Sequence, residues 1–206
     1  MRPTQTAEEL LGSRSRIAVL RVLRGVSVPL NASQISARTG LSRPAVATVL
    51  DNLAAAGIVQ ASSAGRANVH VLVRDNVYVE RIIEPVFSGE EAIADELVKH
   101  LRARFQELAV SVILFGSYAR GDQDLSSDVD VVLVAADSHT KGLLESAAYN
   151  LMGEFYARFG AHLSPLVYDR EEAADLEARA PDLFASLQED GLTICGLSAW
   201  EWNSNA

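Results

Sequence analysis

The chain has 206 residues, 49% of them hydrophobic and 22% charged, which is typical of a globular protein with one large or two small domains. Cys195 is the only cysteine, which excludes an intramolecular disulfide, and no apolar run approaches the roughly 20 residues of a membrane span. Residues 1–9 lack the apolar core of a signal peptide, so we expect a cytoplasmic protein that does not contact a membrane.

The net charge of -9 is unevenly distributed along the chain. Residues 1–75 hold nine arginines and four acidic residues, for a net charge of +5, whereas residues 76–206 hold nine basic and 23 acidic residues, for a net charge of -14. This asymmetry predicts two domains with different partners, residues 1–75 and 91–206, joined by residues 76–90. Arginines suit contacts with phosphate and guanine, although a solvated surface that lacks acids would have the same composition.

Residues 1–75 show the pattern of three helices and a hairpin. Apolar side chains recur on one face of each expected helix, Asn31 and Ser42 are suitable N-caps, and glycines follow each helix. The expected elements are helices at 15–23, 31–40 and 42–57, and strands at 58–60 and 69–73. A helix-turn-helix followed by a hairpin is a winged helix. The segment from Ser33 to Val59 resembles bacterial winged-helix regulators in length and in its apolar positions.

This resemblance implies duplex DNA as a partner. The exposed side chains of the third helix that would reach base edges are Arg43, Thr48 and Asn52. Arg66, in the turn between the two strands, would meet phosphate or the minor groove. The alternative is a winged helix that only dimerises or binds another protein. A homodimer is compatible with either interpretation.

Residues 76–90 contain too many apolar side chains for a free linker, and we expect a short helix there that packs two domains or two chains together. Beyond it, helical and strand patterns alternate, which predicts a small α/β (α+β) domain with a mixed sheet flanked by helices. The expected elements are helices at 92–108 and 141–158, one or two helices at 171–188, and strands at 110–115, 128–134, 162–168 and 192–195.

The chemistry of this second domain lies between residues 114 and 134. Asp128 and Asp130 project from the same face of a strand, where two carboxylates in an apolar sheet repel each other unless a cation compensates them. Hard oxygen ligands suit Mg²⁺ that also holds a substrate phosphate. Gly116-Ser117 follows a buried strand and allows the backbone to approach a phosphate, and Arg120 adds a positive charge. These groups suit phosphoryl or nucleotidyl transfer.

Gly116-Ser117, ten further residues and then Asp128-Val129-Asp130 resemble the signature of the DNA polymerase beta nucleotidyltransferase superfamily, and the similarity to its minimal members covers about residues 92–195. The resemblance implies that Gly116 and Ser117 bind ATP or another nucleoside triphosphate. It also implies that Asp128 and Asp130 are catalytic residues that bind Mg²⁺. Active members carry a third carboxylate on a later strand, as the base that activates the attacking hydroxyl.

In this sequence Ser164 stands where that third carboxylate is expected. Serine is neither a strong metal ligand nor a base, and Asp169 lies on the opposite face of the strand if side chains alternate strictly. Pro165 could shift that register through a bulge. Whether the domain still catalyses transfer is therefore left open.

Three functions follow from the sequence. The first is an enzyme that transfers a nucleoside monophosphate to an acceptor hydroxyl, including one on a protein. The second is a DNA-binding transcriptional regulator whose degenerate transferase domain senses nucleotide. The third is an antitoxin-like protein with a toxin partner, because minimal nucleotidyltransferases are often paired with a toxin.

Overall fold

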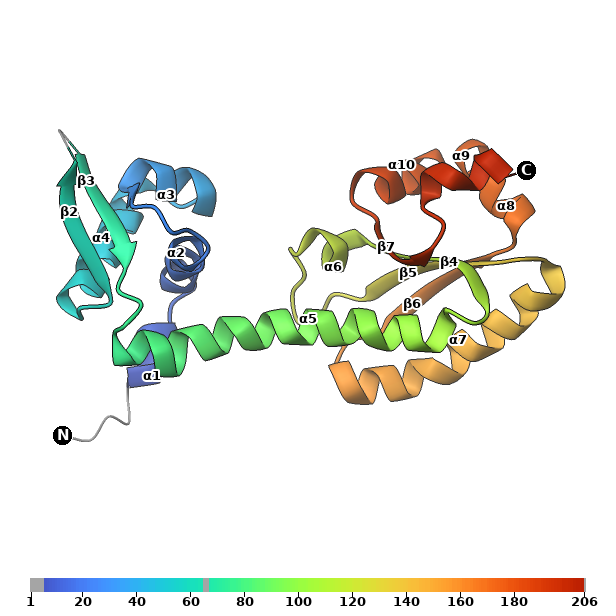
Figure 1. The fold of residues 1–206 in the computed structure, drawn as a ribbon, viewed down its shortest axis with the longest axis horizontal. Coiled ribbons are helices and arrows are strands. Elements are labelled where there is room, and N and C mark those ends of the chain that lie inside the picture. The colour runs from blue at the N-terminus through green and yellow to red at the C-terminus, as the bar shows by residue number, and fades with distance from the viewer. Residues whose placement is uncertain (1–5, 65–66, 206) are drawn as a thin grey trace. The chain divides into compact units, whose positions relative to one another are not determined.

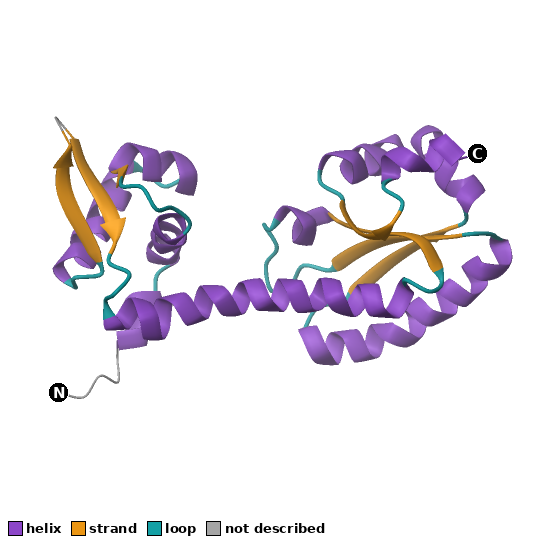
Figure 2. Ribbon diagram, in the orientation of Figure 1, coloured by secondary structure: helices purple, strands orange, loops and turns teal. Residues whose placement is uncertain are grey.

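The computed structural model describes residues 6–64 and 67–205, and the chain divides into two compact units, Met1–Ile93 and Ala94–Ala206. Helices are combined with two small sheets, as Figure 2 shows, so the expected mixture of α and β structure is confirmed. The domain limits expected from the sequence stay a prediction. None of the helices in the described chain has both the length and the apolar character needed to span a bilayer.

The first unit has the helices α1 to α4 and a three-stranded antiparallel sheet of order β1-β3-β2 (Figure 1). Its elements are α1 (Thr6–Leu11), α2 (Arg14–Arg24), β1 (Leu30–Asn31), α3 (Ala32–Thr39), α4 (Arg43–Ala55), β2 (Val59–Ala64), β3 (Ala67–Leu72) and η1 (Val79–Ile83). The expected caps are present. Asn31 accepts from the backbone N–H of Gln34, whose side chain accepts from the Asn31 N–H in return. Ser42 caps α4 by accepting from Ala45 N.

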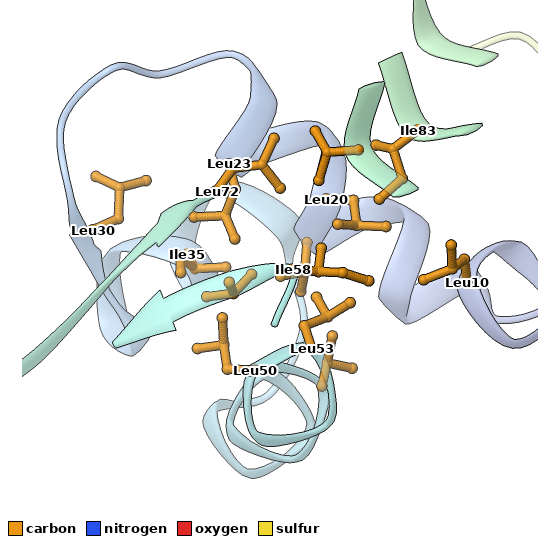
Figure 3. Close-up of a cluster of buried hydrophobic side chains, with 14 of the residues drawn as sticks. Leu10, Leu20, Leu23, Leu30, Ile35, Leu50, Leu53, Ile58, Leu72 and Ile83 are labelled. Atoms are coloured by element: carbon orange, nitrogen blue, oxygen red, sulfur yellow. The ribbon is translucent and has the colours of Figure 1, made fainter. Parts of the chain in front are cut away.

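One buried apolar cluster holds the first unit together. Figure 3 shows side chains from the helices and from β3 meeting in this cluster. Leu20 of α2, Ile35 of α3 and Ile58 before β2 are each fully buried. The cluster also includes Ile83 and Phe87, so the segment that follows the hairpin belongs to the core of this unit. Burial of a side chain of this size contributes about 1.5–3 kcal/mol to stability.

The segment after β3 differs from the sequence prediction of a short helix at 76–90 and a separate helix from residue 92. The π-helical turn η1 continues directly into one helix, α5 (Glu84–Phe105). Pro85 is the second residue after the π-helical turn η1, where the regular α-helical hydrogen-bond pattern is already interrupted, so the missing N–H of proline is accommodated. The second half of α5 supplies Leu97 and Leu101 to the core of the second unit.

Basic residues of α2 bind the acidic first turns of α5. Arg24 Nε lies 2.8 Å from Glu84 Oε2, and Arg24 Nη1 lies 2.5 Å from Glu91 Oε1. Arg21 lies 2.7 Å from Glu90 and its guanidinium stacks over Phe87, 4.8 Å from the ring centre. Arg74 Nη1 lies 3.4 Å from Glu84 Oε1 as well, so three of the nine arginines that make the segment basic are already paired within the unit.

The second unit contains a four-stranded sheet of order β6-β5-β4-β7, in which β5 and β6 are parallel and the other pairs are antiparallel. After α5, its elements are β4 (Ala109–Phe115), α6 (Gly116–Arg120), β5 (Val129–Ala135), α7 (Ser138–Phe159), β6 (Leu163–Tyr168), α8 (Arg170–Ala174), α9 (Leu176–Arg179), α10 (Pro181–Glu189), β7 (Leu192–Gly196) and η2 (Ala199–Asn205). Helices α5 and α7 cover one face of this sheet, and α8, α10 and η2 cover the other (Figure 1).

Alternation along the central strand β5 builds two cores. Val129, Val131 and Leu133 lie in the cluster with α5 and α7, and all three are fully buried. Val132 and Val134 lie in the cluster with α8, α10 and η2. Asp130 precedes Val132 on the same face. Its carboxylate is therefore placed at the end of the sheet face that these later helices cover.

Candidate functional site

The candidate site forms where β4 ends and β5 begins. Phe115, the last residue of β4, pairs with Asp130, and the chain then turns directly into α6. Gly116 begins α6 with a φ of 72°, in the left-handed region that glycine tolerates. A Cβ atom at this position would lie 2.7 Å from Asp130 Oδ2. Only glycine therefore fits between this turn and the carboxylate without displacing it.

Asp128 and Asp130 flank the buried Val129, with Asp128 exposed and Asp130 half-buried. Burial raises the pKa of the Asp130 carboxyl above its ordinary value, and the charge of Asp128 raises it further. A hydrogen bond from the Ser164 hydroxyl opposes this rise in the pKa. Ionisation of Asp130 beside Asp128 is therefore electrostatically unfavourable, and a bound cation would offset this penalty.

Ser164 lies beside Asp130 in the structure. The parallel register of β5 and β6 pairs Asp130 with Ser164, and Val131 with Pro165, without a bulge. Asp169 caps α8 instead, accepting from Glu172 N at 2.9 Å and from the Ser138 hydroxyl at 2.9 Å. The helix cap holds the Asp169 carboxylate away from the register position of Ser164.

The loop between α6 and β5 is shaped by Asp124, which sequence reasoning did not single out. Its carboxylate accepts from the backbone N–H of Ser126 at 2.8 Å and from the hydroxyls of Ser126 and Ser127. These bonds lower the pKa of Asp124, so it stays ionised. The Asp-x-Ser-Ser sequence is a turn signal that could have revealed this feature. The turn ends immediately before Asp128 and therefore helps to position the backbone of that residue.

Arg120 ends α6 and is bound by two acids. Its Nε lies 3.2 Å from Asp122 Oδ2, and its Nη1 lies 3.7 Å from Asp190 Oδ2. All three side chains are more than a third exposed, so these pairs are weak and salt-sensitive. A phosphate would have to compete with Asp122 and Asp190 for the guanidinium.

The described residues contain no group of three or more His, Cys, Asp or Glu side chains that could hold a metal ion without other ligands. The two carboxylates that are present nevertheless fit Mg²⁺, which keeps several waters and is completed by phosphate oxygens of its substrate. The lack of a side chain at Gly116 supports this fit, because it allows the α6 turn to lie against the Asp130 carboxylate.

The candidate DNA-contacting residues of the first unit do not all share one face. Arg43 stands exposed in the first turn of α4, and Thr48 is exposed in its middle with its hydroxyl donating to Pro44 O. Asn52 is exposed as well, but it lies about two and a half turns beyond Arg43 and points in the opposite direction. Arg66 lies outside the described residues.

Comparison with known proteins places the second unit in a family. The model of the nucleotidyltransferase domain matches residues 94–180. The chain is 34% identical over 79 residues to "Putative protein adenylyltransferase MJ0141" of Methanocaldococcus jannaschii, an alignment that covers 38% of this chain and 78% of that relative.

The chain belongs to the nucleotidyltransferase family.

A second relative of this nucleotidyltransferase is "Putative protein adenylyltransferase MJ1305" of the same organism, 32% identical over 106 residues. That alignment covers 51% of this chain and 64% of the relative, so the chain spans less than two thirds of that protein. A solved structure described as "Crystal structure of the toxin-antitoxin with AMP-PNP" is 21% identical, with 54% of this chain and 81% of that chain covered. The TM-score between the two structures is 0.37.

The contact between Gly116 and Asp130 can be measured with Gly116→Ala. This change should destabilise the nucleotidyltransferase by the left-handed strain of about 1–2 kcal/mol plus the cost of moving the carboxylate. Gly121→Ala is the matched control, because Gly121 has nearly the same φ, 73°, with open space around it. In an Asp130→Ala background, chemical denaturation should give Gly116→Ala the same cost as Gly121→Ala. Equal costs for the two substitutions in the wild-type background would disprove the contact.

The raised pKa of Asp130 predicts how stability depends on pH. A carboxyl whose folded pKa is raised favours the folded state at low pH, and this contribution is lost as pH rises through the folded pKa. Asp130→Asn should therefore raise the melting temperature at pH 7, and the gain should vanish below about pH 4. Asp95→Asn, at an exposed position of α5, should leave the melting temperature unchanged both at pH 7 and at low pH. A melting temperature of Asp130→Asn that falls at pH 7 would contradict this electrostatic account.

Proposed function

We propose that this nucleotidyltransferase binds a Mg²⁺–ATP complex at the junction of β4, α6 and β5. The observation that carries the proposal is the contact of the Gly116 backbone with the Asp130 carboxylate. A backbone without a side chain beside a metal-binding carboxylate suits a phosphate that touches both. Other nucleoside triphosphates carry the same phosphates, and the binding test will show whether they bind as well as ATP.

Each residue has a separate part in this proposal. Asp128 and Asp130 would hold Mg²⁺, and Gly116 and Ser117 would bind the phosphates. Bound Mg²⁺ would supply charge neutralisation at the phosphate oxygens. Arg120 would contribute a positive charge once phosphate displaces its two exposed acidic partners. Ser164 is paired with Asp130 across β5 and β6, and its hydroxyl would favour the ionised form of that carboxyl.

Catalysis of transfer is limited by the absence of a base at the position of Ser164. A serine hydroxyl at neutral pH does not accept a proton from an acceptor hydroxyl. Asp169 and Glu172 are held by the α8 cap, and Glu172 also binds Lys141 Nζ at 2.6 Å. We therefore propose nucleotide binding with slow transfer of a nucleoside monophosphate, which leaves a nucleotide-sensing role for this unit.

A second proposed function is DNA binding by the first unit. The order helix, short strand, helix, helix and hairpin, with β1 paired to β3, supports its assignment as a winged helix. Arg43 and Thr48 on α4 would approach base edges. Arg21 and Arg24 are engaged with α5, so they would contribute less to phosphate binding than the segment charge suggests.

ATP with Mg²⁺ should raise the melting temperature of the full chain, and EDTA should remove most of the shift. A hundredfold excess of ligand over its Kd corresponds to about 2.7 kcal/mol of added stability. Asp128→Asn combined with Asp130→Asn should abolish the shift, whereas Asp95→Asn should retain it. Equal shifts in wild type and double variant would rule out this site.

Transfer from labelled ATP should be slow or undetectable for the wild type. Loss of a general base lowers a rate by about 10²–10⁴-fold, so Ser164→Asp should raise labelling of an acceptor within that range. Ser164→Ala is the control that removes the hydroxyl without adding a base. Brisk wild-type labelling that survives Ser164→Ala and is lost in Asp169→Asn would show that Asp169 acts as the base.

The full chain should bind duplex DNA with an affinity that falls steeply with salt, by a log–log slope of about -0.9 for each phosphate contacted. Arg43→Ala should weaken binding and relax sequence preference. Arg81→Ala, at an exposed position of η1 away from α4, should leave binding near wild type. Absence of binding at low salt would leave a protein-interaction module as the function of this unit.

A further inference from the structure

The second unit contains a cavity of about 300 Å³ that the nucleotide site does not use. Its floor is the sheet at Val110 and Val134, and its walls come from α8 and from the chain after β7. Val134 lies four residues along β5 from Asp130, which is about 13 Å at the usual rise of a strand. The cavity is therefore separate from the carboxylates.

The lining of this cavity is mainly apolar. Ala173, Ala174 and Leu197 contribute methyl groups above the valine floor. A volume of this size is at the lower end of the range for sites that hold small molecules. The walls therefore suit a short hydrocarbon body rather than a nucleotide.

Trp202 forms part of the wall of the cavity. The residue is 94% buried, and its indole Nε1 is itself buried without an acceptor in the parts of the chain that the structure describes. A ligand in the cavity would therefore contact the indole ring, which makes Trp202 a reporter of binding.

Charged side chains stand at the rim of the cavity. Arg170 and Glu171, the first two residues of α8, are exposed there. The guanidinium of Arg170 has five donors and matches a carboxylate. Glu171 is the only acidic side chain among the described residues that line the cavity. The guanidinium thus favours a ligand that brings acceptor oxygens.

We propose that this cavity is a binding site for a small aliphatic carboxylate. The hydrocarbon chain lies on Val110 and Val134, and the carboxylate oxygens accept hydrogen bonds from Arg170. An amine in the same place would meet the like charge of the Arg170 guanidinium.

Fluorescence of the full chain tests this site. The chain has two tryptophans, and Trp200 is 64% exposed, so Trp200→Phe leaves Trp202 as the reporter. Hexanoate should shift and quench the Trp202 emission with a Kd on the order of 1 mM, the value expected for a ligand of so few atoms. Hexanamide should bind at least tenfold more weakly, and hexylamine more weakly still.

Two further substitutions locate the ligand. Arg170→Gln, at an exposed position, should abolish the preference for hexanoate over hexanamide without changing the fold. Ala174→Phe, which fills the cavity, should remove binding of both probes while far-UV circular dichroism stays unchanged. Asp130→Asn should leave hexanoate binding intact, so this result is independent of the nucleotide site.

No change in Trp202 emission up to 50-fold above this Kd would show that the cavity holds only water and overturn the proposal. Tighter binding of hexylamine than of hexanoate would overturn the assignment of a carboxylate. Hexanoate binding that persists unchanged in both Arg170→Gln and Ala174→Phe would place the ligand elsewhere and also contradict it.

Discussion

The Gly116 backbone lies close to the Asp130 carboxylate, and the arrangement of the candidate site in the second unit depends on this close packing. A Cβ at position 116 would come within 2.7 Å of Asp130 Oδ2, so the turn from β4 into α6 requires glycine as long as the carboxylate stays in place. Pairing of Phe115 with Asp130 fixes both sides of this contact. The register of β6 then brings Ser164 to the other side of Asp130. The turn at the start of α6, a carboxylate and a neutral hydroxyl thus meet in one row across three elements.

The electrostatics of this row are consistent with a cation site that lacks a base. Burial and the neighbouring Asp128 raise the pKa of Asp130, which is the effect that a bound divalent cation would reverse. The other nearby carboxylates are occupied elsewhere: Asp169 and Glu172 form a capping box, and Asp124 shapes its own turn. In the proposed function the unit binds a nucleotide, and the register position beside Asp130 offers the Ser164 hydroxyl in place of a carboxylate that would activate an acceptor.

Much of this arrangement could be predicted from the sequence because it depends on local patterns. The apolar run at 110–115 predicted β4, and the caps at Asn31 and Ser42 followed from residue type. The shared face of Asp128 and Asp130 stays a prediction, because Asp128 precedes the first residue of β5. The contacts of Arg120 with Asp190 and of Arg24 with Glu91 depend on tertiary packing, so charge counts alone could not predict them. The same holds for the continuity of α5, because the packing of Phe87 in one core and Leu101 in the other stabilises a single helix.

The central claim is that Asp128 and Asp130 hold a divalent cation whose nucleotide phosphates rest on the Gly116-Ser117 backbone. The most direct measurement is a crystal structure of the full chain with Mg²⁺ and a non-hydrolysable ATP analogue. The account predicts Mg²⁺ at about 2.1 Å from oxygens of both aspartates, with a phosphate against the backbone of α6. A triphosphate bound away from α6, or Mg²⁺ that contacts neither aspartate, would contradict it.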